Sequence, residues 1–215
     1  MKFKITKDWI KSFFVMIIAV IVMGMCVSLL VMCDMGADPC SAMNYGISHK
    51  LGMSFGNYQL LSNIVLLIIV IIFDKKLIGT GTLGNMILVG YSADFFTWIW
   101  KEVCHIQAQL NLGIRIVILI PALILFILAA AIYMQSGHGT APYDAVSFLI
   151  SEKIEKHSGK NMVRIVYDLA ATGIGVIAGG EVGVITILMV ILLGPTVDLV
   201  GRIMKTRRGV EKQGV

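Results

Sequence analysis

Hydrophobic residues gather in long, nearly unbroken runs along the chain. Six such runs cover about 12–33, 58–73, 82–100, 113–134, 162–179 and 182–201. A helix needs roughly 20 apolar residues to cross the hydrocarbon core of a bilayer, whereas a strand of a membrane barrel alternates apolar and polar side chains. Stretches such as NIVLLIIVIIF show no alternation. The pattern therefore predicts an all-α membrane protein with six transmembrane helices.

Composition supports lipid as the solvent of this chain. Hydrophobic residues make up 57% of it and charged residues only 14%, whereas charged residues are about 25% of an ordinary soluble domain. A water-soluble core could not bury so much apolar surface. The lipid bilayer is therefore the first partner that the sequence predicts.

The basic residues predict the orientation in the membrane. They concentrate in the N-terminus, the 74–81 turn, the 135–161 connection and the C-terminal tail, and only Lys50, Lys101 and Arg115 fall on the other side. By the positive-inside rule both termini are cytoplasmic, and 204–215 is a cytoplasmic tail. The net charge of +5 then reflects orientation, so no nucleic-acid partner is predicted.

A short phrase occurs twice in the chain. GADPCSA at 36–42 and GTAPYDA at 139–145 share Gly, Pro and Ala at the same spacing, and GTGTLGNMILVGYSAD at 79–94 matches GVITILMVILLGPTVD at 183–198. The chain therefore reads as one polytopic domain over 1–215, with repeat 1 at about 12–100 and repeat 2 at about 113–203. Each repeat has three spans, an odd number, so the second repeat enters the membrane inverted. Inverted repeats recur in secondary transporters.

The repeated phrase predicts a tight turn into a short helix, at 38–52 and at 141–155. Pro39 and Pro142 suit the first helical position, and Asp144 in the first turn suits the helix dipole. Two interpretations remain open. The more ordinary one is a helix that lies in the membrane interface with an apolar side on lipid. The other is a re-entrant half-helix whose N-terminus points at a ligand.

Three patterns together resemble the YczE/YitT family of bacterial integral membrane proteins, and its YczE-like branch most. They are GADPCSAMNYGISHKLGMSFG, GTGTLGNMILVGYSAD and GHGTAPYDAVSFLISEKI followed by GGEVGVITILMVILLGP. The resemblance extends over about 12–203 and implies a multi-pass protein of the bacterial inner membrane with no settled activity. The family usually has an aromatic residue and Asp where this chain has Cys40–Ser41, and only Tyr143–Asp144 keeps that pair.

Ionisable residues within membrane spans are the strongest functional candidates, because burying them is costly. Arg164, Tyr167 and Asp168 are spaced to share one helix face. Asp168 either binds a solute or proton or only pairs with Arg164 to fasten helices, and both readings remain open. The candidate substrate-binding residues are Asp168, Arg164, Tyr167, Pro39, Pro142, Asp144, Asn63 and Asp94.

The sequence lacks enzyme motifs. It has no G-x-x-x-x-G-K-[ST] loop, H-E-x-x-H or G-x-S-x-G pattern, no C-x-x-C pair, and its four histidines are not spaced to share a metal. We therefore expect no enzyme, no cofactor and no metal site. The sequence predicts that the protein binds or transports a small solute between the repeats. The alternative is a non-transporting accessory or assembly partner of another complex. A homo-oligomer or a membrane partner protein remains open.

Overall fold

The computed structural model describes residues 6–106, 110–154 and 160–213, and the regular structure in these ranges is helical. The all-α prediction is confirmed for them. The α-helices are α1 (Lys7–Met32), α2 (Pro39–Leu51), α3 (Phe55–Phe73), α4 (Thr80–Trp98), α5 (Leu112–Gln135), α6 (Pro142–Ile154), α7 (Lys160–Ala178) and α8 (Val184–Gln213). A 3-10 turn, η1 (Lys75–Leu77), precedes α4, and a π-helical turn, η2 (Ile99–Val103), follows it.

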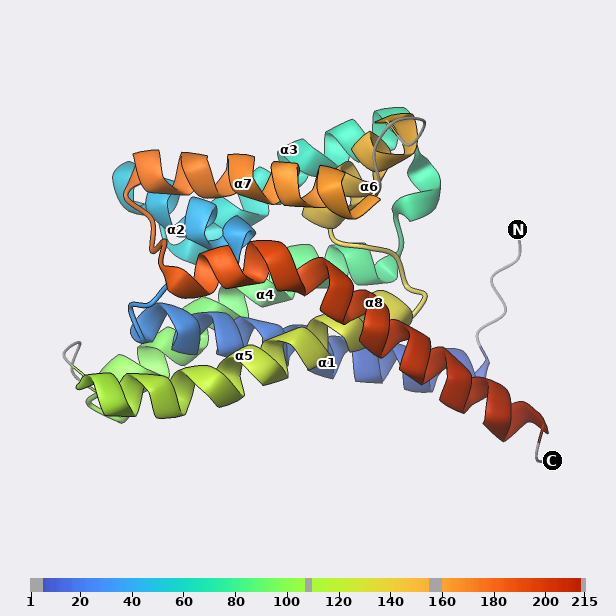
Figure 1. Cartoon of the computed structure of the whole chain (residues 1–215), viewed down its shortest axis with the longest axis horizontal. Coiled ribbons are helices and arrows are strands. Elements are labelled where there is room, and N and C mark those ends of the chain that lie inside the picture. The colour runs from blue at the N-terminus through green and yellow to red at the C-terminus, as the bar shows by residue number, and fades with distance from the viewer. Residues whose placement is uncertain (1–5, 107–109, 155–159, 214–215) are drawn as a thin grey trace.

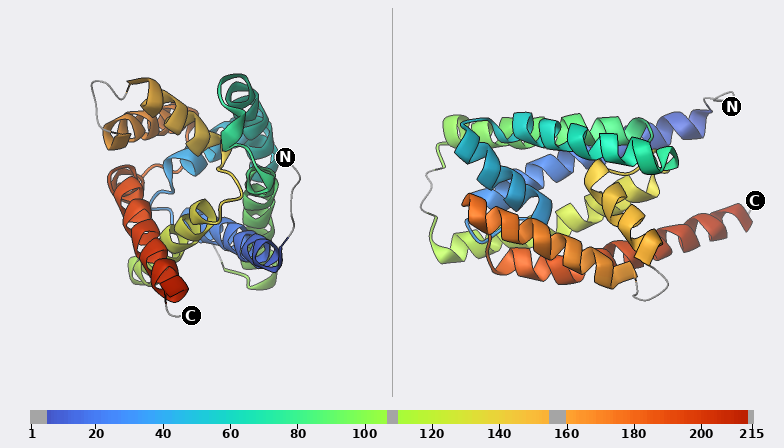
Figure 2. Two further views of the ribbon diagram at one scale, coloured as in Figure 1. Left: turned by 90° about the vertical axis from the view of Figure 1, so that its right-hand side faces the viewer. Right: turned by 90° about the horizontal axis from the view of Figure 1, so that it is seen from above.

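The longer helices lie side by side along the longest axis of the molecule, and α2 and α6 lie between them (Figures 1 and 2). The start of α1 and the end of α8 share one end of the bundle, and the connection from α4 to α5 lies at the other. The two short helices enter from opposite ends, as the right-hand view of Figure 2 shows. The first described helix therefore begins at the same end of the bundle at which the last one finishes.

Four of the described helices are long and apolar enough to cross a membrane: α1, α3, α5 and the part of α8 from Val184 to Ile203. The other two predicted spans form helices as well, α4 and α7, each 19 residues long. They are less apolar because α4 carries Asn85 and Asp94 and α7 carries Arg164 and Asp168. Helix α8 continues to Gln213, so the predicted tail is largely an extension of the last helix.

The outer surface of the bundle is apolar. Ile72 on α3, Val117 on α5 and Ile177 on α7 expose 71%, 71% and 79% of their surface. Inside, Leu30 of α1, Phe126 of α5 and other buried side chains of α1, α5 and α8 form one continuous cluster. Lipid tails are as apolar as these outward side chains, so the structure suits a bilayer.

The short helices cross from one half of the chain to the other. Helix α2 packs against α7, and α6 packs against α3, while α1 and α5 pack against each other between the halves. In α2 only the last turn, His49 to Leu51, is exposed. The rest of α2 is buried or partly buried, so this helix does not expose an apolar side along its whole length. In α6 the exposed residues are Phe148, Glu152 and Lys153, and residue 155 of the predicted range lies outside the described residues.

Equivalent turns lead into the two short helices. Gly36 and Gly139 have φ of 104° and 98°, values that L side chains rarely adopt. Each turn is held to a helix start of the other half by two backbone hydrogen bonds. Ile185 N donates to Met35 O (3.2 Å), Ala37 N to Glu181 O (3.2 Å), Gly81 N to His138 O (2.7 Å) and Thr140 N to Leu77 O (3.1 Å). The repeated phrase therefore makes the same connection twice.

Candidate functional site

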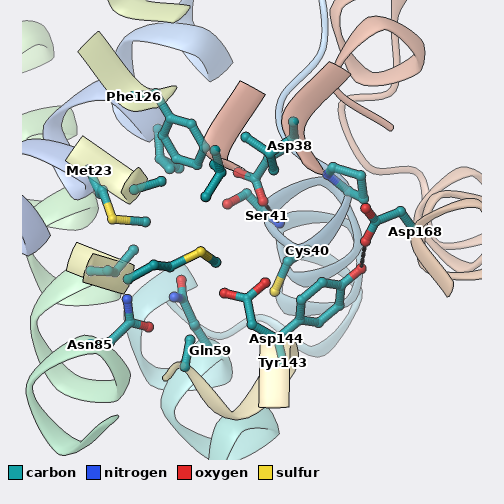
Figure 3. A pocket seen from close by; sticks show the side chains of 18 of the residues that line it. Met23, Asp38, Cys40, Ser41, Gln59, Asn85, Phe126, Tyr143, Asp144 and Asp168 are labelled. Carbon is teal, nitrogen blue, oxygen red and sulfur yellow. Dashed lines mark hydrogen bonds between the residues drawn. The ribbon is translucent and has the colours of Figure 1, made fainter. Parts of the chain in front are cut away.

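An internal cavity of about 70 Å³ lies where the starts of α2 and α6 meet. Figure 3 shows Asp38 and Cys40 of α2 and Asp144 of α6 approaching one space, with Gln59 and Asn85 at its side. Roughly 30 Å³ is the share of one molecule in liquid water, so the cavity has room for a few waters or one small solute. Its polar lining consists of Asp38, Cys40, Ser41, Gln59, Asn63, Asn85, Tyr143, Asp144, Arg164 and Asp168.

One wall of the cavity is an ion network between α6 and α7. Arg164 Nη2 lies 2.8 Å from Asp144 Oδ1, and Arg164 Nε lies 3.6 Å from Asp168 Oδ2. The Tyr143 hydroxyl donates to Asp168 Oδ1 at 2.8 Å. Asp168 is only 2% exposed. The spacing of Arg164 and Asp168 along α7 does bring them together, and the structure adds Tyr143 and Asp144 from α6.

The opposite wall carries a carboxylate without a cation. Asp38 caps α2, and its Oδ1 accepts the Ser41 N–H at 3.1 Å. Its Oδ2 has no hydrogen-bond partner among the described residues, and the same holds for Gln59 Oε1. Asp38 is 7% exposed and Gln59 5%. A buried polar atom left without a partner is costly, so these two oxygens mark the polar part of the cavity.

The remaining candidates divide between the cavity and other places. Asn63 and Pro39 line it. Pro142 begins α6, buried but outside the lining. The Tyr167 ring packs on Tyr143 at a centroid distance of 4.7 Å, behind the lining.

Asp94 lies elsewhere in the structure. Its Oδ2 accepts the Gly56 N–H at 2.9 Å and so holds the start of α3, because the first N–H groups of a helix lack partners within the helix. The carboxylate therefore has a local structural role, and Asp94 is not among the residues that line the cavity.

Several polar lining residues were not among the candidates from the sequence, namely Asp38, Cys40, Gln59 and Asn85. One signal could have found Gln59. It lies four residues before Asn63 on a mostly apolar helix, so the two amides share one face. Among the described residues no cluster of three or more His, Cys, Asp or Glu side chains could hold a metal ion.

A wider hollow of about 810 Å³ lies near the end of the bundle opposite the termini. Asp34, His49, Lys101 and Glu181 are among its lining residues. Burial and the neighbouring Asp34 carboxylate raise the pKa of Glu181 to about 7. On α1, Val27 lines the cavity between α2 and α6, and Ser28 lines this hollow. We call the hollow the vestibule, since along α1 it begins where the cavity ends.

The chain belongs to the family described as "Family of unknown function (DUF6198)", which it matches over residues 10–202. It is similar to the "Uncharacterized protein YyaS" of Bacillus subtilis, at 26% identity over 82% of this chain and 86% of the relative. It is also similar to the "Uncharacterized membrane protein YczE" of the same organism, at 25% identity over 74% and 71%. A Haemophilus influenzae "Uncharacterized protein" is 24% identical over 87% and 82%.

These relatives confirm the YczE-like resemblance seen in the sequence. Together with the apolar helices, they identify the chain as a membrane protein. No solved structure matches it.

Proposed function

We propose that this chain, as a member of a membrane-protein family of unknown function, binds a small solute in the central cavity and carries it across the membrane. The observation that carries the proposal is the meeting of α2 and α6 at a cavity lined by Asp38, Asp144, Arg164 and Asp168. Buried ionisable groups inside a membrane protein mark solute or ion pathways. Short helices whose N-termini point at such a site are typical of secondary transporters. The proposed activity is carriage and not catalysis.

Two inverted repeats with three spans each are part of the proposal. Corresponding residues make corresponding contacts, since Gly79 N donates to Thr82 Oγ1 at 3.0 Å and Gly183 N to Thr186 Oγ1 at 3.3 Å. Helices α4 and α7 then complete the six spans, with Asn85 of α4 and Arg164 and Asp168 of α7 turned toward the cavity. The positive-inside pattern supports cytoplasmic termini in a bacterial inner membrane.

The layout also supports alternating access. The vestibule would admit solute from the outer side as far as the level of Val27 and Ser28. On the inner side the Arg164–Asp144 and Tyr143–Asp168 contacts tie α6 to α7. In the proposed cycle these contacts break when the cavity opens toward the cytoplasm. Two halves of similar build facing opposite sides make such an exchange of states possible.

The test is the thermal stability of the detergent-solubilised protein against a library of metabolites and ions. A ligand that binds only the folded state raises its melting temperature. We expect at least one compound to do so in the wild type and to lose this effect in Asp168→Asn. The matched control is Asp94→Asn, which removes a helix carboxylate outside the cavity and should keep the response. A hit that survives Asp168→Asn would move the solute site elsewhere.

The alternative function is that of an accessory or assembly partner. It predicts that no library compound stabilises the protein and that another membrane protein co-purifies with it at constant stoichiometry. That combined result would replace the carrier proposal.

A further inference from the structure

The lining of the central cavity has unbalanced charge. Three carboxylates, those of Asp38, Asp144 and Asp168, face it together with one guanidinium, that of Arg164. Arg164 lies within ion-pair distance of both Asp144 and Asp168. Asp38 has no ion pair among the described residues, and its Oδ2 has no hydrogen-bond donor there either. Two negative charges are therefore left unmatched, one shared by Asp144 and Asp168 around Arg164 and one on Asp38 at the start of α2.

The neutral lining of the same cavity adds a second acceptor. Gln59 Oε1 is buried, lines the cavity and has no donor among the described residues. This observation is independent of the acidic residues, because Gln59 belongs to α3 and carries no charge. Two unpartnered acceptors that line one cavity suit a ligand with N–H donors, since a buried acceptor without a donor costs free energy that a ligand can recover.

The helix starts in the cavity do not favour an anion. Helix N-termini carry partial positive charge, but Asp38 already caps α2 and Asp144 occupies the first turn of α6. An anion would also face three carboxylates in a medium of low dielectric constant, where like charges repel strongly. A cation would instead be attracted by the three carboxylates.

The remaining lining is apolar and comes from Met23, Val27, Phe126 and neighbouring residues. Figure 3 shows Phe126 and Met23 on the side of the cavity away from Asp168. Such a wall accommodates hydrocarbon, which a bare inorganic cation lacks. The cavity thus combines unmatched negative charge, free acceptors and an apolar side.

We infer that the solute is a small protonated amine, whose ammonium group lies between Asp38 and Gln59 and whose hydrocarbon part lies against Met23 and Phe126. The inference rests on the proposed function, since it names the chemical class of the solute at the same site. Asp38 and Gln59 are then specificity-determining residues, and the pair of Arg164 with Asp144 forms the wall of the cavity on the side of α6 and α7.

The experiment compares three compounds of similar size and different charge: ethylammonium, ethanol and propionate. Each is titrated into the purified full chain in detergent at pH 7 and constant ionic strength, and the melting temperature is recorded. We expect a saturable increase with ethylammonium alone. Asp38→Asn should weaken that response by roughly tenfold to a hundredfold, the range for losing a charged hydrogen-bond partner.

The controls keep the test independent of folding. Asn and Ser are both good N-caps, so Asp38→Asn and Asp38→Ser each keep the start of α2 while removing the charge. Asp94→Asn removes a carboxylate that does not line the cavity and should respond as the wild type does. An equal ethylammonium response in both Asp38 variants and the wild type would overturn the inference.

Other outcomes separate this inference from the proposed function. Stabilisation by ethanol, by propionate or by a neutral library compound, lost in Asp168→Asn, would overturn the amine and leave the carrier proposal standing. Stabilisation by sodium or ammonium ions that depends on Asp38, without any by ethylammonium, would assign the site to an inorganic cation. No stabilisation by any compound would overturn both proposals.

Discussion

The turns into α2 and α6 have the same backbone and different side chains. Gly36 and Gly139 share their left-handed conformation, and Pro39 and Pro142 both begin a helix. The carboxylates differ. In the first half Asp38 precedes the proline, and its Oδ2 has no hydrogen-bond partner in the part of the chain that the structure describes. In the second half Asp144 follows the proline and pairs with Arg164. The shared backbone therefore sets the architecture. The differing side chains give the cavity one wall on which Asp144 and Asp168 share the cation Arg164 and one wall on which Asp38 has no ion pair among the described residues.

The largest expected effect comes from removing Arg164, the cation that Asp144 and Asp168 share. Arg164→Met leaves Asp144 and Asp168 buried without their partner, and breaking a buried ion pair typically costs about 3–5 kcal/mol. We expect a large drop in the melting temperature of the solubilised protein.

The triple change Arg164→Met, Asp144→Asn, Asp168→Asn serves as its control. It removes the stranded charges together with the cation, so it should recover much of the lost stability. A single variant as stable as the wild type would show that the two carboxylates do not depend on Arg164.

The next effect tests the equivalence of the two turns. A Cβ at Gly139 would meet Gly79 N at 2.5 Å and Thr82 Oγ1 at 2.6 Å, and one at Gly36 would meet Thr186 Oγ1 at 2.5 Å and Gly183 N at 2.7 Å. Backbone strain of about 1–3 kcal/mol adds to this crowding. We therefore expect Gly36→Ala and Gly139→Ala to lower the melting temperature by similar, large amounts.

Gly137→Ala is the matched control for these turns. Gly137 also has positive φ, 77°, but nothing lies within 4 Å of its added Cβ. This variant should lose only the roughly 1–2 kcal/mol of left-handed strain. If Gly36→Ala cost no more than Gly137→Ala while Gly139→Ala cost much more, the two turns would not be equivalent.

The smallest effect is a contrast in pH dependence between two connections. Burial and Asp34 raise the pKa of Glu181, between α7 and α8, from 4.5 to about 7. The folded protein then holds a proton that the unfolded chain has released, so this contribution to stability is present below pH 4.5 and is lost as the pH rises to about 7. Glu181→Gln should remove that loss.

His138, between α5 and α6, contributes a pH dependence of stability with the opposite sign. Burial lowers the pKa of its ring below 6.5. The ring packs edge-on against Trp9 at a centroid distance of 5.0 Å. The unfolded chain then binds the proton first, so stability falls as the pH drops below 6.5. Melting temperatures from pH 5 to 8 should show that His138→Gln reduces the acid loss and Glu181→Gln the loss toward neutral pH. Identical profiles for both variants and the wild type would contradict these assignments.

The sequence predicted most of the helices, because their apolar runs are long and local. It also predicted the side of α7 that carries Arg164 and Asp168, because spacing within one helix is a local property. It did not predict that Asp38 and Gln59 belong to the same cavity, since that depends on how α2 packs between α3 and α7. The role of Asp94 was also out of reach, because its partner is a backbone N–H 38 positions away.

The exchange of short helices between the halves bears on how the chain is made. Helix α2 is synthesised long before α7, yet α7 packs against it. Lys50 Nζ donates a hydrogen bond to Ile177 O at 2.6 Å, across 127 positions of the chain. Until α7 has been synthesised, α2 lacks the helix that packs on it. Contacts between residues so distant in sequence are slow to form. Completion of the first half therefore waits for the last helices to leave the ribosome. Each half supplies a helix that covers the short helix of the other half. A chain released after α4 would therefore leave α2 without the helix that packs on it.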